Sequence, residues 1–229
     1  MKIDKKYITG LALFVLFIIW TILVKVVDVA PIGPQNTEVG FSTINGAIHE
    51  LFGLNMFWYK LTMAFGILAI ACAGVFAVIG LVQLIQRKSL NKVDHKLIAA
   101  GVLYLLIIIL YVLFEKLVIN YRPVIMPDNT VPEASYPSSH VMVICVILGS
   151  VPYLIKDYLR KDDLTRIVSI VCYVIMGLTV IGRLLSGVHW FTDIIGGVLI
   201  SASFLLIFAA VSHRLDVLKR RRNRRRHKA

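Results

Sequence analysis

Long apolar segments constrain this chain more than any other feature. A helix needs roughly 20 apolar residues to cross the hydrocarbon core of a bilayer. With 58% hydrophobic residues among 229, the chain carries more apolar surface than a soluble domain of this length can bury. We therefore predict an all-α integral membrane protein whose six transmembrane helices form a bundle. The six predicted spans are residues 7–28, 57–85, 97–120, 139–157, 164–186 and 190–212.

Basic residues are distributed unevenly between the two ends of these spans. The loops at 29–55 and 121–137 together hold a single one, Arg122. Lys and Arg gather instead before the first span, near 87–96 and 156–166, and after residue 212. Because cytoplasmic loops carry the excess of positive charge, we expect both termini in the cytoplasm and the two acidic or neutral loops outside.

The two ends of the chain have separate interpretations. The first span is too long for a removable signal peptide and lacks a small-residue cleavage site, so we expect a retained anchor. The tail at 213–229 holds nine of the 25 Lys and Arg residues and directly follows a span, which favours contact with anionic lipid of the inner leaflet. It lacks aromatic residues for base stacking, so no nucleic-acid partner is expected. We divide the chain into a membrane domain, 1–212, and this cytoplasmic tail, and find no signal for an oligomeric state.

Three polar stretches lie at the outer ends of the predicted helices. The third span ends in "FEKLVINYRP" (114–123), and the fourth begins with "YPSSH" (136–140). The fifth and sixth are joined by "GRLLSGVHWFTD" (182–193). All three stretches are therefore expected at a similar depth near one membrane face, where a helical bundle brings them together.

The residue types in these stretches fit phosphoryl transfer. His189 and Asp193 are four residues apart and would share a helix face, so the carboxylate fixes the imidazole tautomer and leaves Nε2 as a nucleophile. Arg122 and Arg183 offer planar guanidinium groups that match phosphate oxygens. The N-termini of the fourth and sixth helices also favour an anion. His140 supplies a second imidazole that can protonate a leaving oxygen.

These stretches resemble the three signature motifs of the type 2 phosphatidic acid phosphatase (PAP2) superfamily. The motifs are K-x6-R-P, P-S-G-H and S-R-x5-H-x3-D, and the matching region covers residues 114–197. The superfamily includes membrane lipid phosphatases and vanadium haloperoxidases, and six apolar spans favour the phosphatases. The resemblance implies hydrolysis of a lipid phosphate or diphosphate on the outer side of the cell membrane. Undecaprenyl diphosphate, phosphatidylglycerol phosphate and phosphatidate are the candidate substrates.

The resemblance also implies three catalytic roles. His189 would be the nucleophile that forms a phosphohistidine, with Asp193 as the group that orients it. His140 would be the general acid. No metal or other cofactor would be needed, because cationic side chains take the place of a metal ion.

Phosphate binding would fall to a second set of residues. By the resemblance, Arg183 and Arg122 would hold the phosphate and Ser138 would donate a hydrogen bond to it. Ser139, which replaces the motif glycine, is counted with them and reduces backbone freedom beside the anion. Lys116 is expected to reach the phosphate as well.

The chain departs from the motifs at two further positions. Lys116 lies one residue closer to Arg122 than the first motif requires, a slip of about 100° on a continuous helix. Because Pro123 disfavours helical geometry at the residue before it, the helix is expected to end earlier, so that the loop absorbs the slip. Gly182 replaces the motif serine before Arg183 and loses one possible hydrogen bond.

Other interpretations stay open at this point. A transporter or scramblase would use the same cationic pocket to move a lipid headgroup without chemistry, but would not need the His189–Asp193 pair. Two His and one Asp also form a possible zinc site, although the neighbouring arginines oppose a cation. Residues 43–54 have helical spacing of apolar positions and predict either an interfacial helix over the pocket or an ordered loop. The cysteines, which indicate no disulfide framework, are Cys72, Cys145 and Cys172.

Overall fold

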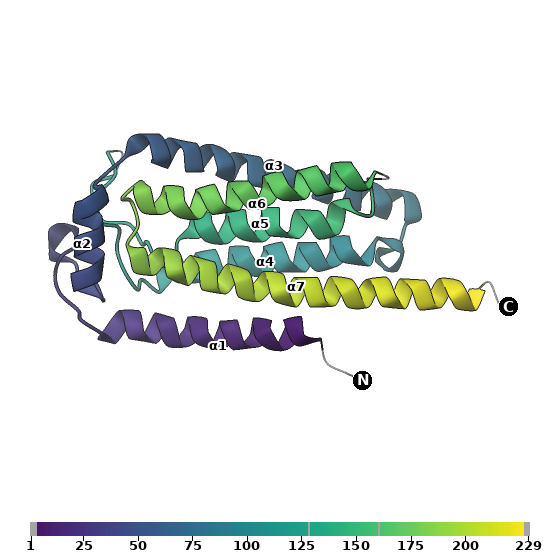
Figure 1. The fold of residues 1–229 in the computed structure, drawn as a ribbon, viewed down its shortest axis with the longest axis horizontal. Coiled ribbons are helices and arrows are strands. Elements are labelled where there is room, and N and C mark those ends of the chain that lie inside the picture. Colours follow the sequence, from purple (N-terminus) through teal and green to yellow (C-terminus); the bar gives the residue numbers. More distant parts are fainter. Residues whose placement is uncertain (1–3, 128, 160, 227–229) are drawn as a thin grey trace.

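The computed structural model, which describes residues 4–127, 129–159 and 161–226, is helical throughout its regular elements (Figure 1). Side chains are described up to residue 218. The long helices run alternately up and down, and both chain ends lie at the end of the bundle opposite helix α2. The elements are α1 (Lys5–Val26), η1 (Pro34–Asn36), α2 (Ser42–Phe52), α3 (Met56–Arg87), η2 (Leu90–Lys92), α4 (His95–Lys116), α5 (Ser139–Ile155), α6 (Asp162–Leu185) and α7 (Phe191–Arg226).

Within the described part of the chain, five helices are long and apolar enough to cross a membrane: α1, α3, α4, α6 and the first part of α7. Large apolar side chains are exposed along their outer faces, as expected where lipid rather than water is the solvent. The prediction of an all-α, multi-pass membrane fold is confirmed. Helix α5 is apolar but has only 17 residues, about 25 Å at 1.5 Å per residue, so a sixth complete span stays a prediction.

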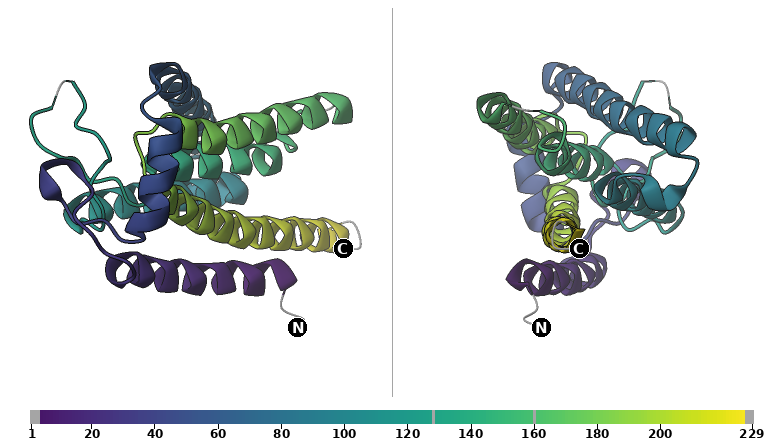
Figure 2. Two further views of the ribbon diagram at one scale, coloured as in Figure 1. Left: turned by 60° about the vertical axis from the view of Figure 1, so that its left-hand side comes forward. Right: turned by 90° about the vertical axis from the view of Figure 1, so that its right-hand side faces the viewer.

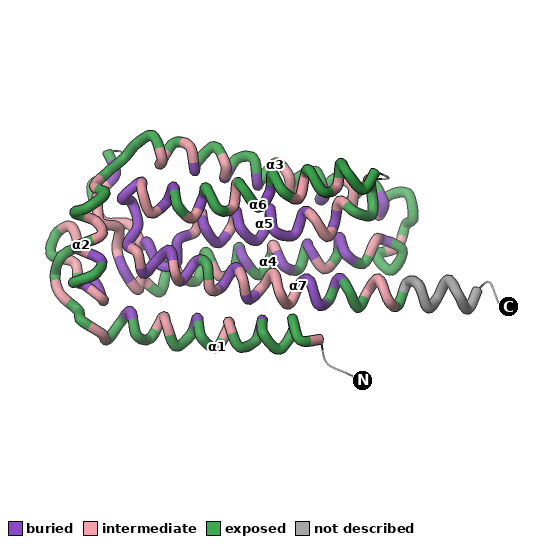
Figure 3. The backbone as a smooth tube through the Cα atoms, viewed as in Figure 1, coloured by how far each residue is buried: buried purple, intermediate pink, exposed green. Residues whose placement is uncertain are grey.

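Helix α5 forms the centre of the bundle. It packs against α3, α4, α6 and α7, and most of its side chains are buried, as the tube in Figure 3 shows. Helix α1 lies at the edge and packs mainly against α7 (Figure 2). A central helix surrounded by others needs no lipid-facing surface, so its length is less constrained by bilayer thickness.

Helix α7 continues without a break past residue 212 to Arg226. The basic tail is therefore a helical extension of the last span over its described part. Residues 227–229, and Lys2 at the other end of the chain, lie outside the described residues. At the same end of the bundle, the buried ammonium of Lys96 pairs with Asp157 at 3.1 Å and with Asp216 of α7 at 2.8 Å.

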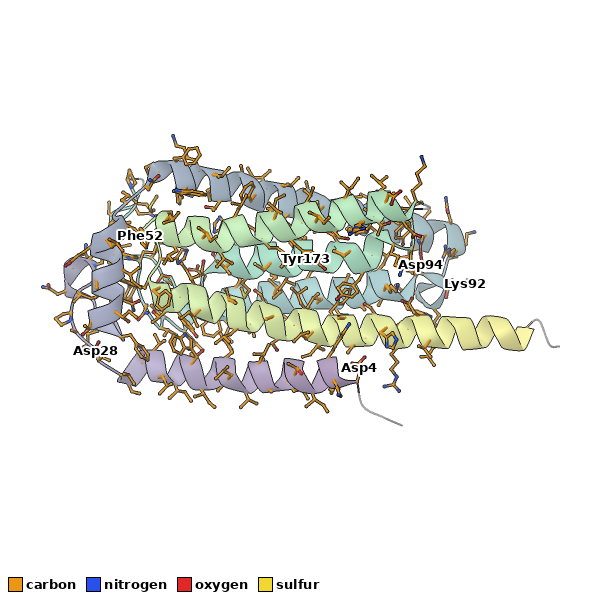
Figure 4. All side chains as sticks on the ribbon, viewed as in Figure 1. Asp4, Asp28, Phe52, Lys92, Asp94 and Tyr173 are labelled. Atoms are coloured by element: carbon orange, nitrogen blue, oxygen red, sulfur yellow. The ribbon has the colours of Figure 1, made fainter. Side chains whose placement is uncertain are left out.

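Most of the 43–54 segment is helical rather than a loop: helix α2 covers Ser42–Phe52, and Gly53 and Leu54 follow its end. Asp28 caps it from outside: its carboxylate accepts the Thr43 backbone N–H at 2.8 Å and the Ser42 hydroxyl at 3.0 Å. The hydrogen bond from the Thr43 backbone, followed by those from the Thr43 and Ser42 side chains, lowers the pKa of Asp28. Figure 4 shows Asp28 and Phe52 at the α2 end of the bundle, and Lys92 and Asp94 at the opposite end.

Tyr136 anchors the segment that leads into α5. Its ring is buried between Phe17 of α1 and Phe114 of α4, and its hydroxyl shares a 2.7 Å hydrogen bond with Thr21. This contact fixes the start of α5 relative to α1 and α4. The aromatic packing of Tyr136 therefore holds the first residues of α5 on one side.

Gly182 lets α3 approach α6 closely. A Cβ at this position would lie 2.8 Å from Thr62 Cγ2 and 2.9 Å from Trp58 Cε3. Thr62 is branched and buried, so it cannot move away easily. The glycine that replaces the motif serine at 182 thus fits the close packing of α3 against α6.

We predict opposite effects for alanine at two glycines of α6. Gly182→Ala should destabilise the protein by roughly 1–3 kcal/mol through overpacking against α3. Gly177→Ala, where a Cβ meets nothing within 4 Å, should be neutral or stabilising by up to about 1 kcal/mol. Thermal unfolding of both variants in detergent provides the measurement. Equal melting temperatures would contradict the close α3–α6 contact.

Candidate active site

The three motif stretches meet at the α2 end of the bundle. Arg183 comes from the last turn of α6, and His189 from the turn that joins α6 to α7. Asp193 lies in the first turn of α7, and His140 in the first turn of α5. Each side chain is thus positioned at or next to a helix end, and hydrogen bonds connect Arg183 to both histidines.

Arg183 is at the centre of this cluster and is fully buried. One of its terminal nitrogens, Nη2, lies 3.0 Å from His189 Nε2 and 3.3 Å from His140 Nδ1. The other, Nη1, donates to Thr62 Oγ1 at 3.3 Å. The guanidinium carbon also lies 5.5 Å from the centre of the Tyr59 ring, within cation–π range. The two imidazoles therefore face each other across a single arginine nitrogen.

The His189 ring is held in one tautomer by its surroundings. Its Nδ1 donates to the backbone carbonyl of Ser135 at 3.1 Å, which leaves Nε2 with a lone pair directed at Arg183. Burial, followed by the positive charges of Arg183 and Arg122, lowers the pKa of His189 well below its usual value. His189 is therefore neutral at physiological pH, as an imidazole nucleophile must be.

Asp193 lies near His189 but not as the helical spacing suggested. Its Oδ2 is 3.7 Å from His189 Nδ1, and it accepts the backbone N–H of Trp190 at 3.0 Å. Helix α7 begins at Phe191, so His189 precedes the helix and the two residues do not share a helix face. The reason is local: a carboxylate at the third helical position reaches back to cap the N-terminus. Asp193 therefore acts on His189 at longer range, and the direct acceptor is Ser135.

Buried donors without a partner surround the cluster. Within the described residues, Ser138 Oγ and Arg183 Nε make no hydrogen bond although both are buried. Arg122 Nε also makes no hydrogen bond, but it forms an ion pair with Glu133 Oε2 at 3.3 Å. Buried polar groups are normally satisfied, so two orphan donors, one on Arg183 itself and one two residues before His140, indicate a site built for a group with several acceptors. A phosphate has such oxygens.

The remaining predicted binding residues are less engaged. Ser139 is half-buried at the start of α5. Lys116 is exposed at the last residue of α4, and its ammonium forms no ion pair within the described residues. Helix α4 ends at Lys116, seven positions before Pro123, so it ends before Arg122 as expected. A phosphate-binding role for Ser139 and Lys116 stays a prediction.

The structure adds residues that the sequence reasoning missed. Thr62 and Tyr59 of α3 hold Arg183, and Asn120 donates to Asp193 Oδ1 at 3.2 Å. Thr62 and Asn120 were detectable as polar residues in or beside apolar segments. Within the described residues, no three His, Cys, Asp or Glu side chains are grouped so that they could hold a metal ion.

Comparison with known proteins agrees with this geometry. The sequence matches the profile of the PAP2 superfamily over residues 67–216, well over half of the chain. The chain belongs to the PAP2 superfamily. Its fold is similar to the crystal structure of a transmembrane PAP2-type phosphatidylglycerolphosphate phosphatase from Bacillus subtilis, with a TM-score of 0.63 and 19% identity. That similarity covers 91% of this chain and 96% of the other. No curated protein sequence matches.

The orphan hydroxyl of Ser138 generates a prediction. Ser138→Ala should change the free energy of unfolding by no more than about 0.5 kcal/mol, because Oγ has no partner to lose. It should weaken binding of vanadate, a phosphate mimic, by about tenfold, the value of one hydrogen bond to a charged group. Thermal unfolding and a vanadate titration measure the two effects.

Ser203→Ala is the matched control. This hydroxyl is equally buried but donates to the Gly10 carbonyl at 2.8 Å, far from the site. It should cost about 1 kcal/mol of stability and leave vanadate binding unchanged. Unaltered vanadate affinity in folded Ser138→Ala would rule out a binding role for Ser138.

Proposed function

We propose that this protein is a membrane lipid phosphatase that hydrolyses a lipid phosphate or diphosphate through a phosphohistidine intermediate. The observation that carries the proposal is the meeting of His189 and His140 at one nitrogen of Arg183, with orphan donors around them. An anion held by these donors would lie beside both imidazoles. Membership of the PAP2 superfamily supports the same chemistry.

In the first step, His189 Nε2 attacks phosphorus and the bond from phosphorus to the lipid oxygen breaks. Arg183, Arg122 and Ser138 bind the phosphate oxygens, where charge is held in the transition state. His140 gives its proton to the leaving lipid oxygen. In the second step, water attacks the phosphohistidine, its proton passes to His140, and phosphate leaves as the nitrogen–phosphorus bond breaks.

The site is proposed to face outward near the surface of the cell membrane. Six helices would cross the bilayer, and the termini with their basic residues would lie in the cytoplasm. The site lies at the opposite end of the bundle, beside α2. A lipid headgroup would enter there while its chains stay in the bilayer. The basic extension of α7 would contact anionic lipid of the inner leaflet.

Phosphatidylglycerol phosphate, undecaprenyl diphosphate and phosphatidate are the proposed substrates. The solved structure of similar fold is described as a phosphatidylglycerolphosphate phosphatase, which supports including the first of these. The deciding experiment is phosphate release by purified protein against a panel of these lipids in EDTA. Arginine-based phosphate binding predicts activity in the chelator and inhibition by vanadate. Loss in EDTA with recovery on zinc or magnesium would contradict the metal-independent mechanism.

The nucleophile assignment predicts the effect of His189→Ala. Turnover should fall by at least about 10³-fold, because no other group can form the covalent intermediate. Phosphate release and trapping of the acid-labile phosphoenzyme are measured on protein shown to be folded by its melting temperature. Near wild-type release by the folded variant would exclude a phosphohistidine at this residue. Phosphate binding without release by the wild type would favour the non-catalytic transporter or scramblase.

The general-acid assignment predicts that His140→Ala depends on the leaving group. A lipid alkoxide departs poorly without a proton, so its hydrolysis should slow by about 10²–10⁴-fold. An activated aryl phosphate releases a stable phenolate, so its hydrolysis should slow far less. Both substrates are measured on the same preparation. Equal losses would mean that His140 binds substrate or supports packing instead of donating a proton.

A further inference from the structure

A buried asparagine at an unspecified position of the first motif stretch donates a hydrogen bond to the carboxylate of Asp193. Asn120 lies in the loop between α4 and α5, is 1% exposed, and donates from Nδ2 to Asp193 Oδ1 at 3.2 Å. We propose that Asn120 is a positioning residue that holds the carboxylate of Asp193 in its orientation beside His189. This inference rests on the proposed function.

The two oxygens of Asp193 have different supports. Oδ2, the oxygen 3.7 Å from His189 Nδ1, accepts the backbone N–H of Trp190. Oδ1 accepts the Asn120 amide. The Trp190 donor belongs to the backbone and does not depend on the side chain at 190. The Asn120 donor, in contrast, depends on the side chain at 120. With both bonds in place, rotation of the carboxyl plane is restricted, and Oδ2 stays directed at the imidazole.

Asn120 also supports the second acceptor around His189. Its backbone carbonyl accepts the Ser135 backbone N–H at 2.9 Å and the Ser135 hydroxyl at 3.2 Å. Ser135 in turn accepts His189 Nδ1–H through its own carbonyl. One residue thus braces both groups that face the Nδ1 side of the nucleophile.

The Asn120 side chain is poorly explained by stability alone. Its Oδ1 is buried and has no hydrogen-bond partner within the described residues. A leucine, which has the same branched arrangement of heavy atoms, would avoid this unsatisfied carbonyl. The amide orientation is dictated by the carboxylate, because the opposite orientation would direct the Asn120 carbonyl at the oxygens of Asp193. A donor is therefore required here, at a cost in stability.

The test compares Asn120→Leu with Asn120→Asp. Asn120→Leu removes the donor and should lower kcat by about 10²-fold, the cost of a small misplacement of a reacting group. KM and vanadate inhibition should stay near wild type, because the phosphate ligands are untouched. Asn45→Leu is the matched control: it removes an equally buried amide that donates to Gly40 and Thr192. It should lower the melting temperature and leave the shape of the pH–rate profile unchanged.

Asn120→Asp supplies a readout that a structural role would not change. A second carboxylate beside Asp193 repels it, so one of the pair takes up a proton as the pH falls. That shared proton restores a hydrogen bond to Asp193. Activity relative to wild type should therefore rise toward low pH in Asn120→Asp and stay flat in Asn120→Leu. The titratable and charged groups around this position are the same in both variants, so a difference between their two pH ratios comes from the residue at 120. These groups are Arg122, Tyr136, His140, Arg183, His189 and Asp193.

The outcomes are distinguishable. If folded Asn120→Leu retains full wild-type turnover, this inference is overturned and the proposed function is not. The inference is also overturned if activity relative to wild type changes with pH in the same way in Asn120→Leu and Asn120→Asp, since the amide would then act only in packing. A wild-type protein without turnover or phosphoenzyme would overturn the proposed function, and the positioning role with it.

Discussion

A fully buried guanidinium, that of Arg183, is the constraint on which the site depends. A charge removed from water is costly unless it is paired, and more so at membrane depth. Within the described residues, no carboxylate forms an ion pair with Arg183. Its contacts are neutral: the Thr62 hydroxyl, two imidazole nitrogens and the Tyr59 ring. A fold that holds a positive charge among neutral groups is arranged to bind an anion, and the glycine at 182 is what allows α3 to supply half of that arrangement.

The same arginine sets the state of both imidazoles. Because Nη2 is a donor, His189 Nε2 and His140 Nδ1 must both be acceptors toward it. Their remaining nitrogens then donate to the Ser135 carbonyl and to the sulfur of Met63. In the proposed reaction, a phosphate that takes the Arg183 hydrogen bonds releases the His189 lone pair for attack. The anion also favours the protonated form of His140, which the acid step requires. Substrate binding and activation of the two histidines are therefore one event.

Much of this could be predicted from the sequence, because hydropathy and motif order depend only on local composition. The long apolar helices and the meeting of Arg183, His140 and His189 are examples. The 43–54 segment, in contrast, was left open between a helix and a loop. Other features depend on contacts between distant segments. Thr62 meets Arg183 across 121 positions, and nothing in its apolar surroundings marks that partner. His189 was expected on a helix, but the Asp193 carboxylate caps α7 and starts it after His189. The helical continuation of α7 past 212 was missed because basic residues change solvation without ending a helix.

The irregular segments at this end of the bundle explain how a polar site can exist at the edge of a bilayer. Non-helical backbone is tolerated there only when protein groups satisfy it. The Tyr121 carbonyl accepts the Trp190 indole, and the Arg122 N–H donates to the Glu133 carbonyl. These hydrogen bonds connect the loops to each other and to the start of α7. The Nε2 edge of the His140 ring faces the sulfur of Met63, a residue of α3 that is 37% exposed. In the proposed reaction that edge is where a lipid oxygen must leave, because its chains never enter the bundle. In this proposal the proton donor, His140, lies at the boundary between the buried phosphate ligands and the lipid.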